Sequence, residues 1–134
     1  MSFTLRKSAI LRGKKTFQDV FDHGEQFEGT HLRCLMKMSP GEGVKERPRI
    51  KVGFAVSRGI KRAVDRNRIK RLMRESYRLN QHVVPFTVMN STKCADIVFV
   101  YSPRSPLEVR SISFKDVESS VKQILSKIAA AWLT

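Results

Sequence analysis

The chain is poor in acidic residues. Its 134 residues include 12 Asp and Glu against 26 Lys and Arg, which gives a formal net charge of +14 and a pI near 10.5. A protein with this balance repels copies of itself and attracts anions. We therefore expect a partner rich in phosphate, such as a nucleic acid.

Long apolar runs are also missing. No stretch approaches the roughly 20 apolar residues that a membrane-spanning helix needs, and MSFTLRKSAILRGKK has no secretory core followed by a cleavage site. These absences predict a cytoplasmic protein. Internal repeats and low-complexity segments are absent as well. We expect a single domain over residues 1–134, with a loose basic N-terminus over residues 1–10.

Groups that could cut a nucleic acid are scarce. Cys34 and Cys94 lie in apolar contexts without CxxC spacing, which favours buried free thiols over a disulfide or a metal site. The three histidines are scattered, and neither a glycine-rich phosphate loop nor an HExxH motif is present. Asp19 and Asp22 share a helix face, which leaves a protein-only nuclease open, although a solvated acidic face is the favoured interpretation. We predict no catalytic residue and no metal ligand.

The first half of the chain has the patterns of one short helix and two strands. KKTFQDVFDHG has apolar residues at helical spacing and ends on Gly24, which suits a left-handed helix end. Apolar and polar residues then alternate over Phe27–Met38 and again over Ile50–Val56, with turn residues between the two segments. We expect these two strands to form a hairpin with a long loop.

The second half predicts a basic helix, a strand and a final helix. The continuous apolar run from Ala95 suits a buried central strand. Ser113 and Asp116 have capping-box spacing at the start of a final amphipathic helix. The connection between Gln81 and Cys94 is poorly patterned. The expected element order is α-β-β-α-β-α, an α+β fold.

The basic segment Arg58–Arg78 carries nine Lys or Arg residues against two acids, about half of the net charge of +14. At about 100° per residue, the residues from position 66 onward separate into a basic arc of roughly 140° and an opposite apolar arc. We expect a helix that packs its apolar stripe on a core and offers guanidinium groups to phosphate. The basic arc holds Arg66, Asn67, Lys70, Arg71, Arg74 and Arg78, and the apolar arc holds Ile69, Leu72, Met73 and Leu79.

The aromatic residues leave two interpretations open. Phe17 and Phe21 lie one helical turn apart, so their rings could stack on unpaired bases. They could instead anchor the first helix to the sheet, and this second interpretation is the favoured one. The same alternatives apply to Tyr77 and Tyr101.

One stretch resembles a known family. The residues VSRGIKRAVDRNRIKRLMRESYR, from Val56 to Arg78, strongly resemble the signature of the protein component of bacterial ribonuclease P. Its centre is the Arg-Asn-Arg run at positions 66–68, followed by Ile-Lys-Arg. LRGKKTFQDVFDHG is similar to the first helix of that family, and DIVFVYSPRS is similar to its strand after the basic helix.

The resemblance implies a fold and a function. The fold would be an α/β sandwich with a left-handed β-α-β crossover, like the second domain of ribosomal protein S5. The chain would be the protein subunit of an endoribonuclease, a hydrolase whose RNA subunit removes the 5′ leader of precursor tRNA with Mg²⁺ held mainly by the RNA. Contacts with the catalytic RNA are expected from Arg58, Lys61, Arg62, Arg66, Asn67, Arg68, Lys70, Arg71 and Arg74. The leader cleft is expected at Phe17 and Phe21.

Two further rivals stay open. A structural or ribosomal RNA-binding protein would use the same electrostatics without a processing role. A DNA-binding helix-turn-helix protein would need a helix directly before the basic one, where Ile50–Val56 predicts a strand instead.

Overall fold

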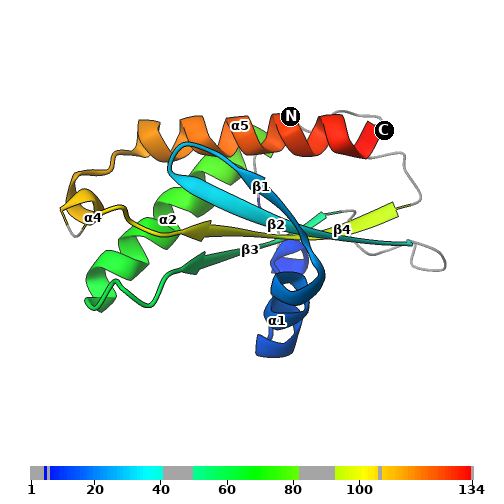
Figure 1. Cartoon of the computed structure of the whole chain (residues 1–134), viewed down its shortest axis with the longest axis horizontal. Coiled ribbons are helices and arrows are strands. Elements are labelled where there is room, and N and C mark those ends of the chain that lie inside the picture. Colours follow the sequence, from blue (N-terminus) through cyan, green and yellow to red (C-terminus); the bar gives the residue numbers. More distant parts are fainter. Residues whose placement is uncertain (1–4, 6, 41–49, 82–92, 106, 134) are drawn as a thin grey trace.

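The computed structural model of the chain describes residues 5, 7–40, 50–81, 93–105 and 107–133. In these residues one four-stranded sheet lies between helices (Figure 1), so the predicted α+β fold class is confirmed. The strands are β1 (Glu25–Glu28), β2 (Leu32–Pro40), β3 (Ile50–Val56) and β4 (Lys93–Tyr101). The helices are η1 (Lys7–Ala9), α1 (Lys14–His23), α2 (Ala63–Asn80), α4 (Glu108–Ser111) and α5 (Phe114–Leu133).

The sheet has the strand order β1-β2-β4-β3. β4 pairs antiparallel with β2 and parallel with β3, so it lies in the interior of the sheet as the apolar run predicts. Ile97, Val98 and Phe99 in β4 are all fully buried. β3 and β4 are parallel neighbours joined through α2, which forms the expected β-α-β unit. Its left-handed crossover stays a prediction.

The predicted hairpin is wrong. The segment Phe27–Met38 is divided between two strands, because the Gly29 N–H donates to the Leu32 carbonyl at 2.8 Å and closes a tight turn. β2 therefore forms its hairpin with β1, and β4 lies between β2 and β3. The run in β4 is apolar on both faces, so burial places it inside the sheet rather than at an edge.

The predicted left-handed end of the first helix is also wrong. Gly24 follows α1 with φ −82°, an extended conformation that any residue can adopt. Glycine is needed there for close packing, because a Cβ atom would lie 2.5 Å from the Val20 carbonyl oxygen and 3.3 Å from the Met36 backbone. The absent side chain lets α1 approach β2.

Helices cover both faces of the sheet (Figure 1), with α2 and α5 on one face and α1 on the other. The apolar stripe predicted for α2 is confirmed, since Ile69 and Met73 are fully buried in the larger core. The Tyr77 ring packs 5.9 Å from Phe99 between centroids. Because Tyr77 and Tyr101 are both buried, neither is a base-stacking platform.

The predicted capping box of α5 is confirmed. The Asp116 N–H donates to Ser113 Oγ at 3.2 Å, and the Ser113 N–H donates back to Asp116 Oδ2 at 2.9 Å. This backbone hydrogen bond is the main cause of a lowered pKa of Asp116. Within the described residues, no helix is both long and apolar enough to cross a membrane. A cytoplasmic location stays a prediction.

The N-terminal segment, which the sequence predicts to be loose, is partly placed on the sheet. Lys7–Ala9 forms a 3-10 turn, and Ile10 bridges to Val52 in β3. The Leu11 N–H also donates to the Val52 carbonyl at 2.8 Å. These bonds fix the segment along the free edge of β3, a non-local pairing that charge and hydropathy could not predict.

Candidate nucleic-acid interface

α2 begins at Ala63, so the first part of the basic segment Arg58–Arg78 is a loop. Arg62 precedes the helix in an extended conformation. Asp65 lies in the first turn, where a negative charge is favourable at the positive end of the helix dipole. Its carboxylate is 4.0 Å from Arg62 Nε, a separation typical of a weak surface pair.

The solvent-facing side of α2 carries four exposed polar side chains that we call the basic face: Asn67, Lys70, Arg71 and Arg74. In the described part of the chain none of these four side chains has a hydrogen-bond or ion-pair partner. The helix beneath them is fixed by the buried Ile69 and Met73. Residues four apart on a helix rise by about 6 Å. The basic face is therefore a preformed row of unneutralised donors.

Arg66 differs from the basic face. Its Nη1 donates to the carbonyls of Ile60 at 2.9 Å and of Lys61 at 2.7 Å, so the guanidinium bonds to the loop before α2. The side chain of Arg66 is only partly exposed. Arg66 therefore has two roles. It lies partly on the outward side of α2, as predicted, and it also fixes the loop that carries Arg58 and Lys61.

Arg68 bonds further into the molecule. Its Nη1 donates to the Val109 carbonyl at 3.1 Å and its Nη2 to the Ile112 carbonyl at 2.7 Å. The guanidinium thus joins α2 to α4 and to Ile112, the residue that directly follows α4. Both partners are neutral carbonyls rather than carboxylates, so Arg68 still adds its full positive charge to this side of the molecule.

Among the described residues, Arg78 is the basic residue of α2 whose charge is neutralised by a close carboxylate. Its Nη2 donates to Glu75 Oε2 at 2.7 Å and its Nε to the same oxygen at 3.1 Å. This pairing raises the pKa of Arg78. By helical spacing Glu75 could pair with either Arg71 or Arg78, and in the structure it pairs with Arg78.

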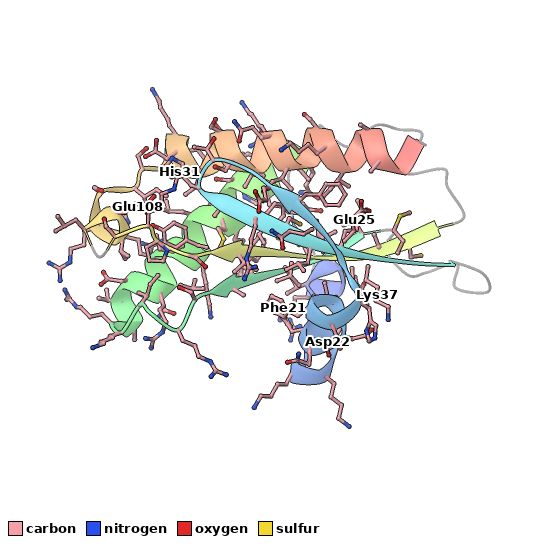
Figure 2. All side chains as sticks on the ribbon, viewed as in Figure 1. Phe21, Asp22, Glu25, His31, Lys37 and Glu108 are labelled. Carbon is pink, nitrogen blue, oxygen red and sulfur yellow. The ribbon has the colours of Figure 1, made fainter. Side chains whose placement is uncertain are left out.

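A polar network that the sequence did not predict holds the α4 segment. Glu108 accepts the Arg104 N–H at 2.6 Å and lies 3.1 Å from His31 Nδ1. Figure 2 shows His31 and Glu108 side by side at the end of the sheet nearest α4. Arg104 Nη2 also donates to the Thr30 carbonyl at 2.9 Å. The Arg104 N–H, followed by His31, holds the pKa of Glu108 below its usual value.

Phe17 and Phe21 lie between α1 and the sheet. Both rings pack against the smaller core while each keeps part of its surface exposed. A Cβ on Gly53 would lie 2.5 Å from Phe17 Cζ, so the glycine lets this ring lie directly on β3. The rings therefore anchor α1, and their exposed parts leave base stacking possible.

The sheet face under α1 continues to a small hollow near the turn between β1 and β2. The hollow has a volume of about 160 Å³ and includes Arg33, Val100 and Arg104 in its lining. Val100 also belongs to the smaller core with the two phenylalanines packed against it. We call this the sheet hollow. It brings two arginines to the face that carries the exposed rings.

Asp19 and Asp22 do not converge on a shared site. Asp19 accepts a hydrogen bond from Lys37 and lies 3.0 Å from His23, and Lys37 lowers the pKa of Asp19. Asp22 accepts from Gln18 Nε2 at 2.9 Å. Across the described residues, no group of three or more His, Cys, Asp or Glu side chains is arranged to hold a metal ion. These carboxylates pair with neighbouring side chains.

The two cysteines are buried free thiols, as predicted. Burial raises the pKa of the Cys34 thiol, which keeps it protonated and unreactive. The cysteines therefore contribute packing, and they supply no ligand to the surfaces described above.

Comparison with known proteins decides the family. A family model described as Ribonuclease P matches residues 5–129, nearly the whole chain. The chain belongs to the ribonuclease P family. A relative from Porphyromonas gingivalis, named ribonuclease P protein component, is 33% identical over 129 residues, which cover 96% of this chain and 88% of that protein. The resemblance to this family, predicted from the Arg-Asn-Arg helix, is thereby confirmed.

Other relatives match over shorter stretches. The ribonuclease P protein component of Chlorobaculum tepidum is 42% identical over 83 residues, which cover 60% of this chain and 53% of that protein. The match therefore spans about half the length of that relative.

Solved structures support the same fold. The RNase P protein from Thermotoga maritima has a TM-score of 0.68 at 24% identity, covering 88% of this chain and 96% of that one. The RNase P protein of Staphylococcus aureus has a TM-score of 0.66 at 20% identity, covering 94% of this chain and 99% of that one.

Proposed function

We propose that this chain is the accessory subunit that binds the catalytic RNA of ribonuclease P and the 5′ leader of precursor tRNA. In this role it assists the RNA-catalysed, magnesium-dependent removal of the leader. The observation that carries the proposal is the basic face of α2, where Lys70, Arg71 and Arg74 are exposed without a carboxylate partner in the described residues.

The arrangement of charge suits RNA phosphates. Each Lys or Arg that neutralises a phosphate releases counterions, and this release drives salt-dependent binding. Arg66 and Arg68 bond to carbonyls and keep their charge, so they strengthen the field around the basic face. Exposed basic residues in the preceding loop extend the surface, namely Arg58, Lys61 and Arg62.

Bond cleavage is assigned to the RNA in this proposal. The carboxylates of Asp19 and Asp22 are paired with neighbouring side chains, and no acidic cluster suited to a metal ion lies among the described residues. Mg²⁺ would then be held mainly by RNA phosphates. The protein would supply positioning and charge neutralisation.

The leader would lie on the sheet face beside α1. The exposed parts of Phe17 and Phe21 offer aromatic surface for unpaired bases, and such stacking tolerates different sequences. The sheet hollow on the same face adds Arg33 and Arg104 for the backbone of the strand. Aromatic surface and guanidinium groups on one face are what a single-strand binder needs.

The deciding experiment measures cleavage of precursor tRNA by the cognate catalytic RNA at low Mg²⁺, with and without this chain. The proposal expects faster cleavage when the protein is present. RNA binding without any enhancement would favour a structural or ribosomal RNA-binding protein. Cleavage by the protein alone, lost in Asp19→Ala, would favour a protein-only nuclease.

The leader contact has its own test. Phe17→Leu and Phe21→Leu keep an apolar anchor for α1 but remove the ring. We expect each to weaken binding of precursor tRNA to the assembled enzyme by about 1–3 kcal/mol per lost stacking contact. Mature tRNA without a leader is the control and should bind equally to all variants. Equal losses on both RNAs would mean that the rings only anchor the helix.

A further inference from the structure

A second basic surface lies where the N-terminal segment meets the later turns of α2. A hollow of about 450 Å³ opens there, and we call it the edge hollow. Its described lining contains four basic residues and no acidic one. The lining residues are Leu5, Lys7, Ile10, Arg12, Arg74 and Arg78.

The edge hollow has an apolar floor and a charged rim. Leu5 and Ile10 are partly buried and pack against the larger core. Lys7, Arg12 and Arg74 are exposed, and the structure records no partner for their side chains among the residues it describes. Like charges that converge on one hollow repel each other unless an anion lies between them.

The rim is held in place by backbone bonds. Ile10 bridges to Val52, and the Leu11 N–H donates to the Val52 carbonyl at 2.8 Å. Lys7 and Arg12 flank this anchored stretch, so their positions depend on the backbone rather than on their own side chains. Replacing either side chain should therefore leave the segment in place.

We propose that the edge hollow binds backbone phosphate of the RNase P RNA, continuing the contact past the basic face and onto the N-terminal segment. Arg74 belongs to both surfaces and makes them continuous. A continuous row of cations along a helix and into a hollow fits a polyanionic strand better than a single small anion. The apolar floor would accept the uncharged face of a ribose. This inference rests on the proposed RNA binding.

The experiment compares three double variants with the unaltered full-length protein. Binding to the cognate RNase P RNA is measured from about 50 to 400 mM salt, and the slope of log affinity against log salt is read for each. The test variant is Lys7→Ala with Arg12→Ala. We expect its slope to be less steep by between about one and two units.

Two other variants make the result decisive. Lys115→Ala with Lys122→Ala removes the same charge from exposed positions on α5 and should keep the original slope. Lys70→Ala with Arg71→Ala tests the basic face itself. If the salt dependence becomes less steep in that variant but not in Lys7→Ala with Arg12→Ala, the edge hollow does not bind RNA, and the proposed function stands. If neither loses slope, RNA binding by α2 fails as well.

A small-anion site is the alternative to an RNA contact. Inorganic phosphate and AMP are titrated calorimetrically into the free protein and into Lys7→Ala with Arg12→Ala. Phosphate binding that disappears in the variant, together with an unchanged salt slope for RNA, would identify a small-anion site and overturn the assignment. Unchanged melting temperatures in all variants confirm that the fold is intact.

Discussion

Two sets of arginines on the same helix make very different contacts. Arg66 and Arg68 turn back onto the protein, where their guanidinium groups bond to four carbonyls in total. Arg71 and Arg74 extend into solvent and contact no partner in the described residues. The arginines of α2 therefore have two different roles. Arg66 and Arg68 hold the structure together, whereas Arg71 and Arg74 are available to a ligand.

This contrast shows how a basic surface can be held in place by some of its arginines while others stay available to a ligand. A guanidinium that bonds to carbonyls orients the surrounding loops and keeps its positive charge. A guanidinium that pairs with a carboxylate, such as Arg78 beside Glu75, has its charge neutralised by that partner. The inward arginines should control stability, and the outward residues should control RNA affinity. Substitutions can separate these two roles.

The largest effect is expected for Arg68→Ala. Hydrogen bonds to charged groups contribute about 1.5–3 kcal/mol each, and the variant would leave the carbonyls of Val109 and Ile112 without this donor. Because Arg68 is only partly buried, water can replace part of the lost bonding, and we expect a total loss of about 2–3 kcal/mol in the free energy of unfolding, measured by urea denaturation. Arg68→Lys keeps the charge but cannot present the same fork, so it should recover little stability. Full stability in Arg68→Ala would show that the inward contacts are incidental.

The next effect is on binding. Lys70→Ala with Arg71→Ala should weaken the complex with the catalytic RNA by about 1–2 kcal/mol at physiological salt, because two phosphate contacts are lost. The free energy of unfolding should change by less than about 0.5 kcal/mol, since both side chains are exposed. Filter binding and urea denaturation on the same samples measure the two quantities. A loss of stability with unchanged affinity for RNA would mean that Lys70 and Arg71 serve the fold rather than RNA binding.

Arg66→Ala should have an intermediate effect of about 1 kcal/mol on stability. Its two carbonyl partners lie in the loop before α2, where water can replace part of the lost bonding. The loss should be local, so amide hydrogen exchange should quicken in the first turn of α2 and in residues 58–62. Faster exchange throughout the sheet would contradict this local role.

The smallest effect concerns pH. The pKa of Glu108 is lowered in the folded state, chiefly by the Arg104 N–H, so its contribution to stability is present above the ordinary carboxyl pKa of 4.5. That contribution is lost as the pH falls through the lower folded value. We expect Glu108→Gln to flatten the acid limb of the stability curve, by less than about 1 kcal/mol. Denaturation midpoints measured from pH 7 downward test this, with His31 unaltered.

The parts of the fold that follow from local pattern were predictable. The period of 3.6 residues placed Ile69 and Met73 inward on α2, and both are fully buried. The Ser113 and Asp116 pair marked the start of α5 because a capping box is formed by neighbours in the chain. The continuous apolar run of β4 predicted an interior strand for the same reason.

The parts that depend on distant segments were not predictable from pattern. Periodicity states which side of a strand is apolar but not which strand lies beside it, so the neighbour of β2 was assigned wrongly. The partners of Arg68 lie 41 and 44 residues further along the chain. The edge hollow likewise needs Lys7 and Arg12 to meet Arg74, and the bridge from Ile10 to Val52 and the hydrogen bond from Leu11 to Val52 bring them there.

Residue pattern alone was enough to predict an amphipathic basic helix on a mixed α+β core and to show a resemblance to the ribonuclease P family. Those conclusions rest on residue types and spacings within single segments. Which arginines bond to the protein itself and which stay available to a ligand became clear from the folded chain. A guanidinium contacts whatever acceptor lies within a few ångströms, and that acceptor is set by chain packing rather than by neighbours in the sequence.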